Sequence, residues 1–345
     1  MNRILHIPLL ALLLLSACAG CRRRGHTVTA GFYYWKTTYA PDAATSKAFQ
    51  DFGARKIYLR CFDADWDEAA AAIRPVAVVR LPAALDKRYE YVPVIFITQK
   101  AISALALKDI TGLSAHLTQL LESLCSSSGM APKEIQVDCD WTAGSKTVYF
   151  DLLQALKRQP FFKDRNLSCT IRLHQVKYKL RSGIPPADRG MLMLYNIGNL
   201  KQATARNSIL DVPLAKDYLA SLDAYPLKLD IALPLFSWCV LFRNGVYGGI
   251  IRDADPAELQ PPLFAAKKGH QFTVTQDTLW HGYGLRTGDV LRAESPVAAD
   301  LKALAAFSAA HLKTDSTTIT FFGADSIALS HFSYHEIKEI VDAYR

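Results

Sequence analysis

Strand-like and helix-like segments alternate through most of this chain, and this rhythm constrains the fold more than any other feature. Eight apolar, β-branched runs are typical of buried strands: 27–35, 56–63, 92–98, 134–141, 167–175, 191–196, 227–235 and 317–323. Segments with helical spacing lie between them: 43–52, 66–73, 113–125, 147–158, 214–222, 298–312 and 334–344. Eight βα units predict an α/β fold, a (β/α)8 TIM-like barrel. No GxGxxG follows the first run, which disfavours an open dinucleotide-binding sheet.

Two segments interrupt the rhythm. After the fifth run, Gly183, Pro185 and Pro186 predict that the expected helix is short or missing. Between the seventh and eighth runs lies an insertion of about 244–296, in which 271–280 alternates like a hairpin. In a barrel this insertion belongs to the face that carries sites, where it would form a lid or a wall. We expect residues 27–345 to form one barrel domain that includes the insertion.

The amino-terminal residues predict where the chain folds. An apolar run, 4–15, is too short to span a membrane but suits a secretory signal. It ends in Leu-Ser-Ala-Cys18, which resembles the lipobox of bacterial lipoproteins. This resemblance implies that 1–17 is a signal peptide, that Cys18 is acylated and that 18–26 is a lipidated tether. An ordinary signal peptide with a chance cysteine is the alternative. Ala19 is not acidic, which favours the outer membrane over the inner one.

Charge and cysteine usage exclude several classes of protein. The formal charge of +8 loses Arg3 with the signal peptide, and three more arginines, 22–24, lie in the tether. There they would bind an anionic leaflet or serve only as a solvated linker. No basic run interleaved with aromatic residues follows, so we expect no nucleic-acid partner. No HExxH and no set of Cys and His residues with the spacing of a zinc site is present, so we expect no metal and no cofactor.

Four of the seven cysteines fall inside strand-like runs and are expected to be small, buried residues beneath the helices. They are Cys61, Cys139, Cys169 and Cys239. Cys21 and Cys125 lie in polar surroundings, where they could be free or paired. This placement argues against a disulfide framework, and we expect a monomer.

The fourth run, IQVDCDWT, carries two carboxylates on one face. Strand side chains alternate, so Asp138 and Asp140 point to the same side. Buried carboxylates are costly unless they are paired or used. The ends of the other runs add further polar and aromatic side chains: Trp35, Arg60, Asp63, Arg172, His174, Tyr195, Asn196, Trp238 and Asp325. Because barrel chemistry sits at the carboxyl ends of strands, these residues are the candidate substrate contacts.

Depth along the strands separates these candidates into two groups. Arg60, Asp138 and Arg172 are expected to meet at middle depth, where a purely structural ion-pair network is the plain alternative to catalysis. Asp140, His174 and Tyr195 lie one step nearer the mouth and are the better candidates for contact with a ligand. A histidine in this position is as often a structural residue, with its hydrogen bonds made within the protein, as a functional one.

Two of these motifs resemble family 18 glycoside hydrolases, the chitinase-like barrels. IQVDCDWT is similar to their fourth-strand DxxDxDxE, and MLMLYN is similar to their sixth-strand MxYD. The resemblance implies catalytic roles for Asp138, Asp140 and Tyr195, the last one assisting an acetamido group. Thr142 stands where the proton-donating Glu belongs. A threonine hydroxyl is no general acid near neutral pH.

Two further positions depart from the same pattern: Ile135 replaces the first Asp, and Asn196 replaces the Asp after the tyrosine. Over nearly the whole mature chain, the sequence is more similar to an uncharacterised family of bacterial lipoproteins, defined as a domain of unknown function. The quoted segments YYW, RCFDADWD, QVDCDWT and ALPLFSW carry this resemblance. It implies a glycoside-hydrolase-like barrel and supplies no reaction.

Three functions follow from these patterns. The first is an envelope glycoside hydrolase with Asp140 as acid/base and a partner carboxylate from Asp63, Asp230 or Asp325. The second is a lipoprotein that binds a glycan or polysaccharide without cleaving it, which accounts directly for Thr142. The third is a structural or assembly factor that uses the insertion as its interface.

Overall fold

Eight parallel strands close into a barrel in the computed structural model, which describes residues 26–252, 254–323 and 325–345. Around the ring the strands are β1 (Thr27–Tyr34), β16 (Ser316–Phe322), β8 (Leu229–Pro234), β7 (Arg189–Met193), β6 (Asn166–Arg172), β5 (Glu134–Cys139), β4 (Glu90–Ile97) and β2 (Ala54–Asp67). Pairing of β1 with β2 closes the ring, so the predicted (β/α)8 barrel is confirmed. The expected signal peptide, Cys18 and Cys21 lie outside the described residues.

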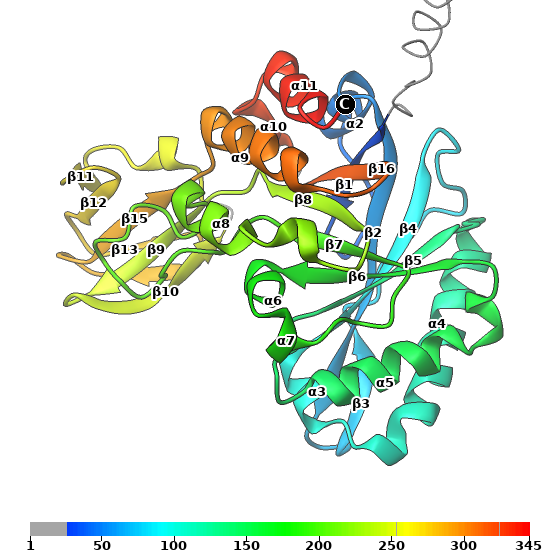
Figure 1. Cartoon of the computed structure of the whole chain (residues 1–345). Helices are drawn as coiled ribbons and strands as arrows, with labels where there is room; N and C mark the ends of the chain where they lie inside the picture. Colours follow the sequence, from blue (N-terminus) through cyan, green and yellow to red (C-terminus); the bar gives the residue numbers. More distant parts are fainter. Residues whose placement is uncertain (1–25, 253, 324) are drawn as a thin grey trace, which may run out of the picture.

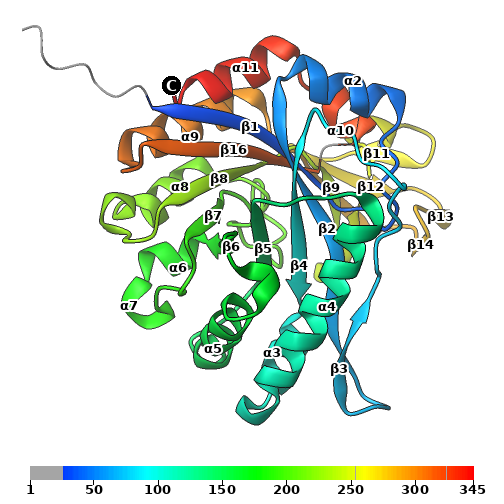
Figure 2. The same cartoon turned by 90° about the vertical axis from the view of Figure 1, so that its right-hand side faces the viewer.

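Helices cover the outside of the ring (Figure 1, Figure 2). The predicted helical segments correspond to α2 (Ala43–Asp51), α4 (Ile110–Ser128), α5 (Lys146–Lys157), α8 (Val212–Leu219), α9 (Ala298–His311) and α11 (Tyr334–Asp342). Shorter helices, α3 (Gln99–Ala104) and α10 (Ser326–Ser330), complete the outer layer. Side-chain caps begin several of them; for example, the Asp42 carboxylate accepts a hydrogen bond from the Thr45 amide at 2.7 Å.

Two predicted boundaries are wrong, and each has a local cause. Segment 66–73 is not a helix, because β2 continues to Asp67 and turns into the antiparallel strand β3 (Ala72–Val76). The Asp67 carboxylate accepts the Ala69 and Ala70 amides at 3.0 and 3.1 Å, which stabilises that turn. The fifth run ends at Arg172 rather than at residue 175, and two short helices follow, α6 (Leu173–Lys177) and α7 (Lys179–Ser182). The prediction of a shortened helix there is confirmed.

The insertion forms a sheet of its own on one side of the barrel, drawn in yellow and orange in Figure 1. Its strand order is β10 (Val246–Arg252), β9 (Trp238–Arg243), β15 (Val290–Glu294), β12 (Gln271–Val274) and β11 (Phe264–Ala266). The sheet therefore begins at Trp238, before the predicted start at 244. The expected hairpin within 271–280 is wrong, because β12 pairs with β11 and β15. The strand β13 (Thr278–Trp280) pairs instead with β14 (Tyr283–Leu285).

Buried cysteines follow the prediction with two corrections. Cys61, Cys139 and Cys169 lie in the main core, as expected. Cys239 belongs to the separate core of the insertion, so it does not lie beneath the barrel helices. Cys125 is free and buried in α4, and the polar surroundings expected for it are wrong.

The amino end of the barrel is closed by buried ion pairs. The Arg189 guanidinium donates to both oxygens of Asp230 at 2.8 and 2.7 Å. Lys56 donates to Glu134 at 2.8 Å, and Ser168 donates to the other oxygen of Glu134 at 2.6 Å. These pairs leave the opposite, carboxyl end of the strands as the place where a site can open.

Within the described residues, no helix is long and apolar enough to cross a membrane. Across the same ranges, no three His, Cys, Asp or Glu side chains gather in a way that could hold a metal ion.

Candidate functional site at the carboxyl ends of β5 to β7

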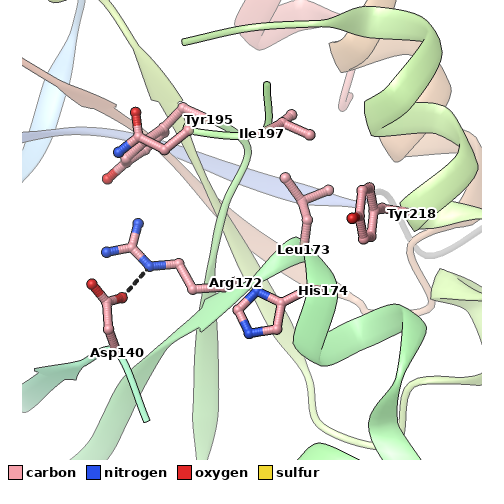
Figure 3. A pocket seen from close by; sticks show the side chains of 8 residues that line it. Asp140, Arg172, Leu173, His174, Tyr195, Ile197 and Tyr218 are labelled. Carbon is pink, nitrogen blue, oxygen red and sulfur yellow. Dashed lines mark hydrogen bonds and ion pairs between the residues drawn. The ribbon is translucent and has the colours of Figure 1, made fainter. Parts of the chain in front are cut away.

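A pocket of about 310 Å³ opens at the carboxyl ends of β5, β6 and β7 (Figure 3). It is lined by Asp140, Arg172, Leu173, His174, Tyr195, Asn196, Ile197 and Tyr218. Five of these were predicted site residues, and the fold brings them together from three separate strand ends. Leu173, Ile197 and Tyr218 were not predicted.

An ion pair between Asp140 and Arg172 lies at one side of the pocket in Figure 3, with Tyr218 at the other. Asp140 directly follows β5, and its side chain is half exposed. Arg172 ends β6, and its guanidinium lies 5.9 Å from the centre of the Tyr195 ring. The two adjacent carboxylates raise the pKa of Arg172, although burial opposes them. The pair therefore presents a fixed donor and a fixed acceptor side by side.

Asp138 lies two residues earlier on β5 and is buried. Thr170 on β6 donates a hydrogen bond to its carboxylate at 2.6 Å. Burial raises the pKa of Asp138 to about 6, with the negative charges of Asp140 and Asp63 adding to the rise. The Arg172 guanidinium and the Thr170 hydrogen bond act in the opposite direction. Near neutral pH, a measurable fraction of Asp138 therefore carries a proton.

A β-bulge brings a second ion pair to the same end of the barrel. Between Arg60 and Phe62 the pairing of β2 with β4 shifts by one residue, so Cys61 has no partner on β4. The shift places Asp63 beside Arg60, whose Nε donates to it at 2.6 Å. Regular alternation along an unbroken strand would put Arg60 and Asp63, three residues apart, on opposite faces. The Arg60 guanidinium also lies 5.9 Å from the centre of the Trp35 ring.

Aromatic rings fill the mouth between these ion pairs. Phe322, at the end of β16, contacts Trp35 and Tyr195, with ring centres 5.4 and 5.6 Å apart. Phe236 stands edge-on to Tyr195 at 5.6 Å. The Tyr195 hydroxyl donates to the Met193 sulfur at 2.8 Å, and burial raises the pKa of Tyr195. Tyr195 is thus a neutral hydrogen-bonding group that is only 5% exposed.

Gln175 holds the two loops that carry the Asp140–Arg172 pair, and sequence reasoning missed it. Its side chain accepts the Arg172 amide at 2.8 Å and donates to the Trp141 carbonyl at 2.9 Å. Gln175 is fully buried, so these bonds are shielded from water. Its spacing of three residues from Arg172 matches a helix-capping position, which is the signal that could have revealed it.

Thr142 is not among the residues that line the pocket. The backbone amide of Thr142 donates a hydrogen bond to the Ser145 hydroxyl at 3.0 Å. The Thr142 hydroxyl accepts the Gly144 amide at 3.3 Å. These hydrogen bonds stabilise the turn that precedes α5. The residue at the position of the chitinase-like Glu therefore has a structural role here.

The remaining wall of the pocket comes from the loop after β7, and the insertion holds that loop. Glu294 on β15 accepts the Trp238 indole N–H at 2.7 Å and the Ser208 hydroxyl. Arg292, which is 1% exposed, donates to Glu294 at 2.6 Å and to the Gln202 carbonyl. Both Ser208 and Gln202 belong to this loop. Asn196, at its start, has a left-handed backbone with a φ of 57°.

The other predicted residues have different surroundings. His174 is on α6 rather than on a strand, and burial together with Arg172 lowers its pKa. The Asp325 carboxylate caps α10 by accepting the Ala328 amide at 2.8 Å. Trp238 lies in the insertion sheet, bonded to Glu294. Asp230 lies at the opposite end of the barrel. Of the three carboxylates expected to partner Asp140, Asp63 is the one whose charge acts on Asp138, two residues before Asp140.

The fold and the pocket define a class, the (β/α)8 barrels with a polar site at the carboxyl ends of the strands. Among solved structures, the chain is similar to a chitinase from Chromobacterium violaceum (TM-score 0.55, 12% identity, 90% of this chain and 98% of that one). It is also similar to the spore cortex-lytic enzyme SleL from Bacillus cereus (TM-score 0.56, 13% identity, 93% and 75%). A third is catalytic domain 2 of the Ostrinia furnacalis Group II chitinase (TM-score 0.51, 11% identity, 94% and 97%).

These similarities establish a shared barrel fold, of the type found in glycoside hydrolases. No protein-family model and no curated protein matches the sequence. The function must therefore be argued from the pocket itself.

Proposed function

We propose that this protein is a glycoside-hydrolase-like envelope lipoprotein that binds a glycan in the pocket between Asp140, Arg172 and Tyr218. The pocket has the size of a site for one or two sugar rings, since small-molecule sites start at about 300 Å³. Its lining combines one ion pair, amide and hydroxyl groups, and aromatic rings. That mixture suits a sugar, which has polar edges and apolar faces.

The Asp140–Arg172 ion pair is the observation that carries this proposal. The Arg172 guanidinium holds the Asp140 carboxylate in place, which makes it a fixed hydrogen-bond acceptor. The pair is well suited to sugar hydroxyls, because the Arg172 guanidinium can donate hydrogen bonds to them and the Asp140 carboxylate can accept hydrogen bonds from them in a fixed geometry. Asp63 is paired with Arg60 in the same way. Thr142 supplies no acid, so binding accounts for more of the site than hydrolysis does.

Hydrolysis is the second candidate, and the raised pKa of Asp138 favours it. A carboxyl group with a pKa of about 6 is a suitable general acid near neutral pH. It would need to reach the glycosidic oxygen from beneath the ligand, with Asp140 or Asp63 stabilising positive charge on the sugar. In this case activity would fall as the pH rises through about 6, since the acid form is lost.

One panel experiment tests both candidates. Residues 26–345 contain the complete closed barrel, so this form can be screened against envelope and plant polysaccharides for binding and for release of reducing ends. We expect binding that Arg172→Met weakens at least about tenfold, since a hydrogen bond to a charged group contributes about 1.5–3 kcal/mol. Arg88→Met, which removes an exposed ion pair with Asp86 at the opposite end of the barrel, is the matched control.

Release of reducing ends that Asp138→Asn abolishes would establish the second candidate. Binding of no glycan by the wild type, under conditions where it is folded, would refute both. Retained hydrolysis in Asp140→Asn would remove the acid/base role that the sequence suggested for Asp140.

The envelope location and the lipid anchor at Cys18 are part of the same proposal. The motif before Cys18 supports them, and Ala19 favours the outer membrane. Labelling cells that produce the full chain with a clickable palmitate analogue tests the anchor. We expect label on the wild type and none on Cys18→Ser; equal labelling of both would contradict the anchor.

A further inference from the structure

We propose that the amino end of the barrel is a membrane-docking face that binds anionic lipid headgroups. This face is opposite the pocket and consists of the segments that lead into the barrel strands. It has a surplus of exposed basic side chains, and it is the end at which the chain enters the barrel. The inference rests on the proposed envelope location, but its test does not use the lipid anchor.

Six basic side chains of this face are exposed and have no acidic partner among the described residues. They are Arg55, Lys87, Lys133, Arg158, Lys163 and Lys228. Their positions follow from the topology: Lys133 directly precedes β5, and Lys228 directly precedes β8. Because the amino ends of parallel barrel strands lie at one end of the ring, these bases share one face.

Acidic side chains offset this charge only in part. Five acids at this end are already paired with bases of their own: Asp51, Asp86, Glu90, Asp188 and Asp223. Asp164 and Asp315 are exposed and have no basic partner in the described ranges. Six unpaired bases against two unpaired acids leave a positive face.

The point of chain entry selects a bilayer as the partner. The His26 ring bonds to the Thr317 hydroxyl at 3.0 Å and to the Tyr344 carbonyl, which fixes the start of the barrel at this end. The arginines at 22–24 and the proposed acylation site, Cys18, lie only a few residues before it. A tether of this length, at most about 3.5 Å per residue, keeps the face within about 30 Å of a membrane that holds the lipid. The tether therefore lets the face approach within the screening length of an anionic leaflet, about 10 Å at 0.1 M salt, where the leaflet attracts basic residues.

Docking in this way would give the pocket a defined direction. The pocket lies at the carboxyl ends of the same strands whose amino ends carry the basic face. A barrel resting on its amino end therefore turns the pocket away from the bilayer. The proposed glycan would then approach from the side opposite the membrane.

Vesicle binding by residues 26–345 tests the face without the lipid. This form contains the closed barrel and lacks Cys18, so failure of the anchor or of glycan binding does not affect the result. The protein is mixed with vesicles of equal parts phosphatidylglycerol and phosphatidylcholine, or of phosphatidylcholine alone, and sedimented. We expect binding to the anionic vesicles only, falling as salt shortens the screening length to about 10 Å at 0.1 M.

A matched pair of triple variants locates the binding surface. Lys133→Glu, Lys163→Glu and Lys228→Glu together reverse three charges of the basic face. Lys36→Glu, Lys108→Glu and Lys201→Glu reverse three exposed charges that follow the carboxyl ends of β1, β4 and β7. One basic residue near an anionic surface strengthens binding about fivefold, or ~1 kcal/mol. The first triple variant should therefore lose at least about tenfold in vesicle affinity, and the second should change it about twofold or less.

Three results would overturn the proposal. Equal losses in the two triple variants would mean that overall charge, and not this face, attracts the lipid. No binding of the wild type to anionic vesicles would exclude a lipid surface. Binding to a soluble polyanion such as heparin, without binding to vesicles, would assign the face to an anionic polymer instead. Circular dichroism of each variant establishes whether it is folded. If the basic-face triple variant does not fold, a second triple variant, Lys133→Gln, Lys163→Gln and Lys228→Gln, is used in its place.

Discussion

The substitution Asp138→Asn should change how the stability of the protein depends on pH. In the folded barrel the pKa of Asp138 is about 6, against an ordinary value of 3.8. The folded state therefore holds the proton more tightly than the unfolded chain. Its contribution to stability is complete below about pH 4 and is lost as the pH rises to about 6. A difference of about two pH units, at about 1.4 kcal/mol each, corresponds to roughly 3 kcal/mol.

Asparagine has nearly the same shape, has no charge and can still accept the Thr170 hydrogen bond. The free energy of unfolding of Asp138→Asn, minus that of the wild type, should thus increase by about 3 kcal/mol between pH 4 and pH 7. Urea unfolding followed by tryptophan fluorescence at several pH values measures this difference. Asp51→Asn, at an exposed ion pair, is the control and should show a change of about 1 kcal/mol or less. A difference for Asp138→Asn that stays constant with pH would refute a perturbed, buried Asp138.

Three further substitutions test the pocket and its support. Arg172→Met should raise the pKa of Asp138 above about 6, because the guanidinium now lowers it, and carbon-detected NMR titration measures this. Glu294→Ala should cost about 3–5 kcal/mol in urea unfolding, since it leaves a buried arginine without its carboxylate. Gly198→Ala should cost about 1–3 kcal/mol and weaken glycan binding, because a Cβ there would lie 2.6 Å from the Asn207 carbonyl oxygen.

The stability predictions for Gly198→Ala and Glu294→Ala each have a control on the same protein. Gly112→Ala lies in α4 with no atom within 4 Å of the added carbon, so it should be neutral or stabilise the fold by about 0.5–1 kcal/mol. Glu339→Ala removes an exposed partner of Lys302 and should cost about 1 kcal/mol or less. An unchanged Asp138 titration in Arg172→Met, or a Glu294→Ala that is no less stable than Glu339→Ala, would contradict the corresponding argument.

The barrel could be predicted because its strands are buried on both faces. Such strands form short continuous apolar runs, and β8, LDIALP, is buried at every position. Because helices are predicted between these runs, only a few topologies are compatible with the sequence. Segment 66–73 was misread because Glu68 and the alanines after it favour a helix, while the pairing of β2 with β3 comes from the tertiary structure.

The site could be predicted only where simple alternation holds along a strand. It placed Asp138 on β5 and Asp140 at the carboxyl end of that strand, one residue after it ends, but it missed the bulge at Cys61 that sets Asp63 beside Arg60. Gln175 was missed although its capping position, three residues after Arg172, is a local signal. Tyr218 is on α8, and its position at the pocket depends on how that helix packs, which no local pattern records.

The buried Arg292–Glu294 pair has a consequence for how a ligand enters. It fastens the loop after β7 to the insertion sheet through Ser208, Trp238 and the Gln202 carbonyl. If the insertion opened as a lid, the buried Arg292–Glu294 ion pair would have to break each time a ligand entered. The free-energy cost of breaking it is too high for frequent motion. The insertion is therefore a fixed support for the pocket wall rather than a lid. The fixed shape of the pocket opening would then determine which ligands bind. The association rate would be limited by diffusion and shape complementarity, and not by the opening of a lid.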